Sequence, residues 1–192
     1  MADSGGGQPV DPIDPPVVSA VAQRLARAGV GAGDRLIVIH VSAGNPFRRW
    51  PSASFAAVAA SLVQLDTRHR IIVTSGPSEG DAAARVIADA QSGLQPADRG
   101  HVLRCGEFSL AELRALVDRA ALYIGGDSGP LHIASTSHVP IVGLYGPTLP
   151  ARSAPWRAPD WPAASIDVSD LPCRPCDQRH CVPGDFRCLT GI

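Results

Sequence analysis

The chain has 192 residues, 45% of them hydrophobic, which is enough to bury the core of one domain with short appended segments. Its formal charge of −1 at pH 7 provides no basic surface of the kind that binds nucleic acid. There is no run of about 18 apolar residues and no apolar signal core near the N-terminus, which argues against a membrane span and against secretion.

Strands and helices are expected to alternate after an irregular start. Residues 1–16 are rich in Gly, Pro and Asp and predict a disordered lead or linker. Helices are predicted over 17–28, from Ser52 or Ser54 to about 65, over 81–91, and from a Ser109–Glu112 capping box to 119. Strands are predicted over 36–41, 71–74, 101–103, 122–124, 139–144 and 165–168. This alternation predicts an α/β fold, a Rossmann-like parallel sheet with helices on both faces.

The stretch 121–148 carries the most specific pattern. A buried strand ends in Gly125-Gly126, and Asp127-Ser128-Gly129 stands where a helix would begin. The first N–H groups of such a helix have no partner within it, so the turn could bind an anion, with His132 facing the same site. The alternative, at about equal weight, is an ordinary capped turn with a structural histidine.

Two further loops follow predicted strands. Arg48 and Arg49 stand just ahead of a helix and could grip a phosphate, although a solvated arginine pair is the more common arrangement. Glu79 follows the next strand and could accept hydrogen bonds from ribose hydroxyls, or could equally belong to the start of a helix. The phosphate-binding pattern G-x-x-x-x-G-K-[ST] is absent, which argues against ATP hydrolysis.

Four of the five cysteines lie close together near the end of the chain. Their spacing, which opens with C-x-x-C, suits one tetrahedral structural metal, and disulfides are the alternative. The four are Cys173, Cys176, Cys181 and Cys188. The fifth, Cys105, is expected to pack in the interior.

Three segments together resemble glycosyltransferase family 9, the ADP-heptose:lipopolysaccharide heptosyltransferases. They are Ile39-His40-Val41-Ser42-Ala43-Gly44 with Arg48-Arg49-Trp50-Pro51, then Gly126-Asp127-Ser128-Gly129-Pro130-Leu131-His132-Ile133-Ala134, then Pro140-Ile141-Val142-Gly143-Leu144-Tyr145-Gly146-Pro147-Thr148. The cysteine cluster also resembles a tail found in part of that family, some members of which hold iron. The resemblance implies the C-terminal, donor-binding half of a GT-B enzyme, with residues 17–170 as the nucleotide-sugar domain and 171–192 as the Cys-rich tail.

The resemblance also implies a donor site. Arg48 falls where the family usually has a lysine on the phosphates, which keeps the charge and changes the geometry. The expected donor-binding residues are Ser42, Gly44, Arg48, Glu79, Leu110, Asp127, Ser128, Gly129, His132 and Thr148. No cofactor is expected for catalysis, and the cysteines are expected to hold structural iron or zinc.

The expected partners are an ADP-heptose-like nucleotide sugar and, through an N-terminal domain that this chain lacks, a glycan or lipid A-core acceptor. That domain would carry the general base of an inverting transfer, so another chain or an oligomer could be required. A cytoplasmic location, peripheral to the inner membrane, is expected. The alternative function is a non-catalytic nucleotide-sugar-binding or assembly module.

Overall fold

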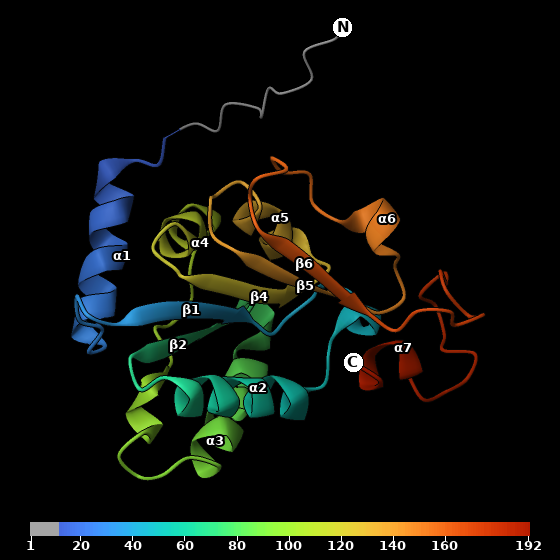
Figure 1. The fold of residues 1–192 in the computed structure, drawn as a ribbon, viewed down its shortest axis with the longest axis horizontal. Helices are drawn as coiled ribbons and strands as arrows, with labels where there is room; N and C mark the ends of the chain where they lie inside the picture. The colour runs from blue at the N-terminus through green and yellow to red at the C-terminus, as the bar shows by residue number, and fades with distance from the viewer. Residues whose placement is uncertain (1–11) are drawn as a thin grey trace, which may run out of the picture.

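The computed structural model describes residues 12–192, in which six parallel strands form one sheet (Figure 1). Their order in the sheet is β3-β2-β1-β4-β5-β6. Strands β2 and β3 therefore extend the sheet on one side of β1, and β4, β5 and β6 extend it on the other side. The predicted Rossmann-like α/β fold is confirmed. The strands are β1 (Arg35–His40), β2 (His69–Thr74), β3 (Val102–Leu103), β4 (Leu122–Gly126), β5 (Ile141–Tyr145) and β6 (Ala163–Asp167).

Helices cover both faces of the sheet. The α-helices are α1 (Pro15–Arg27), α2 (Ser52–Leu65), α3 (Gly80–Ser92), α4 (Leu110–Val117), α5 (Gly129–Ala134), α6 (Pro150–Ser153) and α7 (Arg187–Thr190). Short 3-10 turns are η1 (Pro46–Arg48), η2 (Pro77–Glu79) and η3 (Arg99–His101). None of the helices in residues 12–192 is long and apolar enough to cross a membrane.

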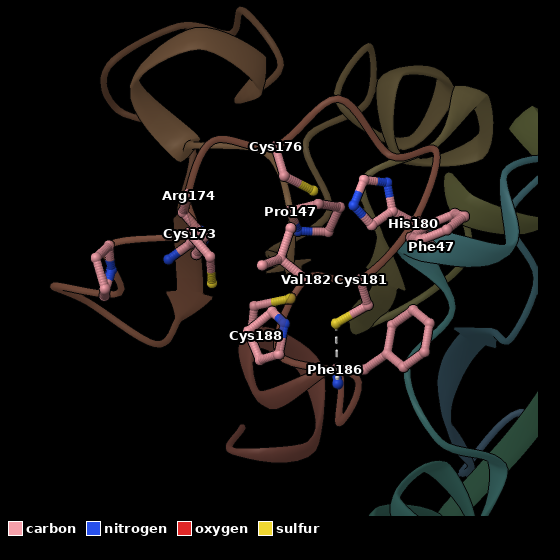
Figure 2. A pocket seen from close by; sticks show the side chains of 12 residues that line it. Phe47, Pro147, Cys173, Arg174, Cys176, His180, Cys181, Val182, Phe186 and Cys188 are labelled. Atoms are coloured by element: carbon pink, nitrogen blue, oxygen red, sulfur yellow. Dashed lines mark hydrogen bonds between the residues drawn. The ribbon is translucent and has the colours of Figure 1, made fainter.

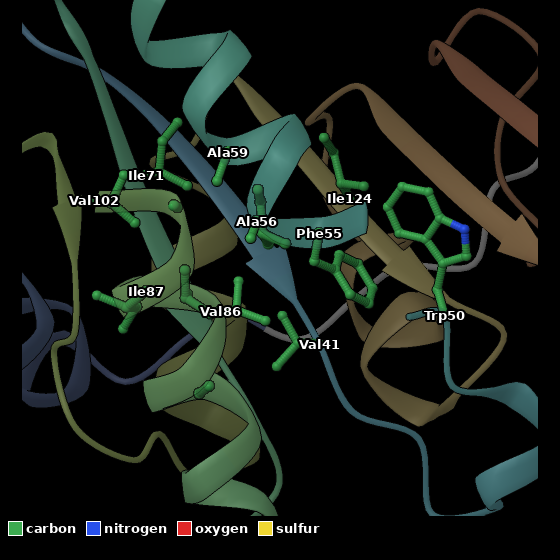
Figure 3. Close-up of a cluster of buried hydrophobic side chains, with 14 of the residues drawn as sticks. Val41, Trp50, Phe55, Ala56, Ala59, Ile71, Val86, Ile87, Val102 and Ile124 are labelled. Carbon is green, nitrogen blue, oxygen red and sulfur yellow. The ribbon is translucent and has the colours of Figure 1, made fainter. Parts of the chain in front are cut away.

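Strand β1 has apolar side chains on both faces of the sheet, so both faces must be covered by helices. Its side chains alternate, so Ile37 and Ile39 join one apolar cluster while Leu36 and Val38 join the other. The first cluster is closed by α2, α3 and α7, and Figure 3 shows side chains of α2 and α3 meeting those of the sheet. The second cluster is closed by α1, α4 and α5. A strand buried on both faces has a nearly continuous apolar sequence, which is the pattern of residues 36–41 apart from His40.

Most predicted boundaries agree with the structure to within two residues. Helix α2 begins at Ser52, and the capping box is present, because the Ser109 hydroxyl accepts from the Glu112 N–H and the Glu112 carboxylate accepts from the Ser109 N–H. Helix α4 ends two residues early, at Val117. Helix α1 begins at Pro15, inside the predicted lead, because proline suits a first helical turn. The rest of that lead falls mainly on residues 1–11, outside the described residues.

Residues 171–192, which we call the tail, pack against the sheet. The buried Arg174 guanidinium pairs with Asp167 at 2.7 Å and donates to the Thr148 carbonyl at 2.6 Å. Leu189 of α7 packs on Gly146, where an added Cβ would lie 2.5 Å from Leu189 Cγ. The tail and the sheet domain are thus in close contact on either side of the predicted domain boundary at residue 170. That boundary stays a prediction.

Candidate functional site

The loops after β1, β4 and β5 meet at the carboxyl edge of the sheet (Figure 1). Strands β1 and β4 are neighbours, yet the chain leaves them toward opposite sides of the sheet. Open α/β sheets bind ligands at this kind of switch point. The two loops approach closely here, since a Cβ on Gly126 would lie only 3.1 Å from the Arg48 carbonyl oxygen. Glycine at the end of β4 is what permits the approach.

Asp127 is the centre of a polar cluster at this switch point. Its carboxylate is almost fully buried, with 3% of the side chain exposed, and so it requires partners. Its Oδ2 accepts from the Thr148 hydroxyl at 2.6 Å and lies 3.4 Å from Arg48 Nη1. Its Oδ1 lies 3.9 Å from Nε2 of His132, whose side chain is half exposed. The structure thus brings four of the predicted donor-binding residues together, and we call them the Asp127 cluster.

Ser128 and Gly129 lie where the sequence predicts, at the start of α5. The Ser128 hydroxyl donates to the Gly126 carbonyl oxygen at 3.3 Å, so it does not cap the helix as expected from its residue type. The N–H of Gly129, the first residue of the helix, has no partner within it. This N–H is available to an acceptor beside the Asp127 cluster.

Ser42 is held inside the protein. Its buried hydroxyl oxygen lies 2.9 Å from His40 Nε2 and accepts from the Gly76 N–H at 2.8 Å. The other ring nitrogen of His40 lies 3.0 Å from the Thr74 hydroxyl. Burial lowers the pKa of His40 to about 4, so its imidazole is neutral at pH 7. These bonds join the ends of β1 and β2, and a donor contact through Ser42 stays a prediction.

Glu79 is paired with Arg49, the second of the two arginines that could have gripped a phosphate. Its Oε1 lies 2.5 Å from Arg49 Nη2, and Arg49 Nε donates to the Ala43 carbonyl oxygen at 2.9 Å. The two adjacent arginines therefore have different roles, because Arg48 turns to the Asp127 cluster while Arg49 ties the loop after β1 to η2. To bind ribose hydroxyls, Glu79 would have to keep at least one carboxylate oxygen available, and this role stays a prediction.

Two predicted residues, Gly44 and Leu110, are exposed and form none of the hydrogen bonds of the Asp127 cluster. Gly44 is exposed in the loop before η1, where nothing would contact an added Cβ. Leu110 is the first residue of α4 and is 67% exposed, after β3 and therefore two strands from β1. Next to it, Phe108 lies under the Arg24 guanidinium at 4.0 Å. Their roles in binding a donor stay predictions.

Gln178 of the tail also belongs to the site, although it was not among the predicted residues. Its amide oxygen accepts from Arg48 Nε at 2.7 Å and from Asn45 Nδ2 at 2.9 Å. This contact joins residues 130 positions apart, in a segment without periodic pattern. No signal in a single sequence could have found it.

The four tail cysteines line one cavity of about 450 Å³ (Figure 2). Phe47 and Pro147 line it from the sheet domain, and Arg174 and Phe186 from the tail. All five cysteines of the chain are free thiols, and Cys105 is buried as expected. Burial raises the pKa of the Cys188 thiol, and the neighbouring thiolates act in the same direction, whereas Arg174 opposes them.

This donor set suits a thiophilic metal in its chemistry. Thiolate sulfurs are preferred by zinc and iron, and Cys181 Sγ accepts from the Phe186 N–H at 3.4 Å, which helps a thiolate carry its charge. Within residues 12–192, however, no three His, Cys, Asp or Glu side chains stand close enough together to hold an ion as they are placed. Metal binding by these cysteines accordingly stays a prediction.

Several known glycosyltransferases are similar to this chain. A sequence model of glycosyltransferase family 9 (heptosyltransferase) matches residues 13–185. Lipopolysaccharide heptosyltransferase 3 of Escherichia coli is 32% identical over 149 residues, which cover 78% of this chain and 42% of that protein. A glycosyl transferase family 9 structure from Veillonella parvula matches with a TM-score of 0.66 at 25% identity, covering 81% of this chain and 41% of that one.

A second solved structure shares the fold. It is the E. coli ADP-heptose lps heptosyltransferase II, with a TM-score of 0.63 at 19% identity, covering 86% of this chain and 48% of that one. The chain thus spans less than half the length of each of these relatives. Since the family match extends over most of the described residues and includes the Asp127 cluster, this chain belongs to glycosyltransferase family 9.

Proposed function

We propose that this chain binds the nucleotide-sugar donor, ADP-heptose or a related compound, of a heptosyltransferase-like glycosyltransferase. The observation that carries the proposal is the convergence of Arg48, Asp127, His132 and Thr148 at the β1–β4 switch point. Family membership and the names of the relatives support the same donor class.

The hydrogen-bond donors of the cluster suit a diphosphate. Arg48 donates from Nε and Nη1 within the protein, and among the described residues its Nη2 has no hydrogen-bond partner. The His132 imidazole is half exposed beside it, and the Gly129 N–H is unpaired within its helix. A phosphate oxygen accepting from these groups would gain charge-assisted hydrogen bonds. Asp127 holds Arg48 and Thr148 in place and would not face the phosphates directly.

The reaction that this site would serve is an inverting transfer. An acceptor hydroxyl oxygen attacks the anomeric carbon, and the bond from that carbon to the phosphate oxygen breaks. The proton passes to a general base of the acceptor-binding domain, and ADP leaves with the electron pair. Arg48 stabilises the charge that develops on the leaving diphosphate. The acceptor would be a lipopolysaccharide or another glycan, reached at the cytoplasmic side of the inner membrane.

Calorimetry with ADP and ADP-heptose tests the proposal. We expect wild type to bind both, and Arg48→Ala to bind them roughly 10- to 100-fold more weakly, the usual cost of a hydrogen bond to a charged group. His132→Ala should weaken binding less. Arg35→Ala is the matched control, since Arg35 is exposed at the opposite end of β1 and should have no effect. Failure of wild type to bind ADP would refute the proposal.

A second candidate is a module that binds the nucleotide sugar without transferring it. The observation that favours it is that two carboxylates beside the site are paired with arginines, Asp127 with Arg48 and Glu79 with Arg49. Neither is free to act as the base. Mixing the chain with a separately produced acceptor domain distinguishes the two, because only a transferase domain would then form a glycosylated product from ADP-heptose.

The tail cysteines would hold one structural metal, iron or zinc. The proposal is supported by the four thiols that line one cavity, and four thiolate ligands would leave no open position for chemistry. Metal analysis of purified protein should find about one equivalent, and Cys181→Ser should lose it. Cys105→Ser is the control, because Cys105 packs in the core away from the tail. Full metal content in Cys181→Ser, or none in wild type, would contradict this assignment.

A further inference from the structure

We propose that Gln178 of the tail is a positioning residue that orients Arg48 in the donor site. Its amide oxygen accepts from Arg48 Nε at 2.7 Å and from Asn45 Nδ2 at 2.9 Å, so it joins both ends of η1. The residue has a backbone φ of 59°, in the left-handed region that glutamine seldom adopts. The surrounding structure therefore maintains an unfavourable backbone conformation where this side chain meets Arg48.

The arrangement leaves one part of the guanidinium for a ligand. With Nε on Gln178 and Nη1 near the Asp127 carboxylate and carbonyl, two of the three nitrogens are engaged. The third nitrogen, Nη2, has no hydrogen-bond partner among residues 12–192. Because a glutamine amide is neutral, it fixes the direction of the side chain without cancelling its charge. A glutamate at the same place would pair with Arg48 and weaken its attraction for a phosphate.

The loop that carries Gln178 is anchored to the other side of the same cluster. Arg174 donates to the carbonyl oxygen of Thr148, the residue whose hydroxyl bonds Asp127. The Cys176 N–H donates to the Pro147 carbonyl oxygen at 3.3 Å. Residues 174–178 of the tail therefore span from the loop after β5 to the loop after β1, and the donor site includes a tail residue that acts through Arg48.

The inference rests on the proposed donor-binding function and is tested by a double-mutant cycle with ADP. Gln178→Ala should weaken ADP binding roughly three- to tenfold, the usual effect of losing one hydrogen bond. In an Arg48→Ala background, Gln178→Ala should have no further effect, since the residue acts only through Arg48. Gln95→Ala is the matched control, an exposed glutamine in the turn after α3.

Equal weakening in both backgrounds, or unchanged binding by Gln178→Ala, would overturn the positioning role while leaving donor binding intact. Absence of ADP binding in wild type would instead refute the proposed function. Thermal unfolding of each variant shows whether the tail is still packed, so that a folding defect is recognised.

A measurement without ligand tests the same contact. The Nε–H resonance of Arg48, assigned by its absence in Arg48→Lys, should exchange slowly with water because it is bonded to Gln178. Exchange should become at least several-fold faster in Gln178→Ala, whereas Gln178→Glu keeps an acceptor oxygen and should retain the protection. Identical exchange in wild type and Gln178→Ala would show that the contact does not orient Arg48.

Discussion

Acidification should destabilise this protein through His40, at the point where β1 and β2 enter the site. The imidazole is buried and bonded to Ser42 and Thr74, and burial lowers its pKa from 6.5 to about 4. The unfolded chain therefore takes up a proton below pH 6.5 that the folded chain does not take up until about pH 4. Stability from this group is complete above pH 6.5 and is lost as the pH falls toward 4.

The size of the loss follows from the two pKa values. One pKa unit corresponds to about 1.36 kcal/mol, so the free energy of unfolding should fall by about 2 kcal/mol at pH 5 and about 3 kcal/mol at pH 4. That is a large part of the roughly 5–15 kcal/mol by which domains are usually stable. The strand ends that hold Ser42 and Gly76 should be affected as the His40 bonds are lost.

Urea unfolding at several pH values between 7 and 4 provides the measurement. His40→Gln is the comparison, because glutamine has no titration in this range and all other groups are common to both proteins. The difference in the free energy of unfolding between wild type and His40→Gln should change with pH by the amounts above. Wild type should lose more stability than the variant on acidification. Parallel pH profiles for the two proteins would show that His40 is not held neutral by burial.

Three further changes test the tail and the helix signals. Gly146→Ala should cost about 1–3 kcal/mol, because its Cβ would lie 2.5 Å from Cγ of the buried Leu189. Arg174→Met should cost about 1.5–3 kcal/mol, because it removes the charged partner of Asp167, which is itself partly exposed, and of the Thr148 carbonyl oxygen. Ser109→Ala should cost about 1 kcal/mol through loss of the capping box. Equilibrium unfolding in urea measures each value.

Limited proteolysis shows whether Gly146→Ala and Arg174→Met loosen the tail specifically or destabilise the whole chain. Cleavage within the tail should precede cleavage of the sheet domain in Gly146→Ala and Arg174→Met. Leu189→Ala added to Gly146→Ala should relieve the overlap, although it removes a buried side chain of its own. Uniform cleavage along the chain, or wild-type stability of either variant, would contradict the packing described for the tail.

The composition of the candidate site followed in part from parallel-sheet geometry. Arg48, Asp127 and Thr148 each come after a predicted strand, and parallel strands place their carboxyl ends at one edge. Their proximity could therefore be expected before any coordinates. The exact pairing could not, because it depends on side-chain rotamers and on how closely two loops approach, as at Gly126.

Most helices and strands of the sheet domain, and their order, could be predicted from the sequence, because helix and strand formation depend on local signals such as the apolar run of β1 and the capping box at Ser109. The pairing of each arginine with its carboxylate, and the contact of Gln178 with Arg48, could be seen only in the folded molecule. Those contacts join segments far apart in the chain, and they form only when packing of the whole sheet brings the loops into reach.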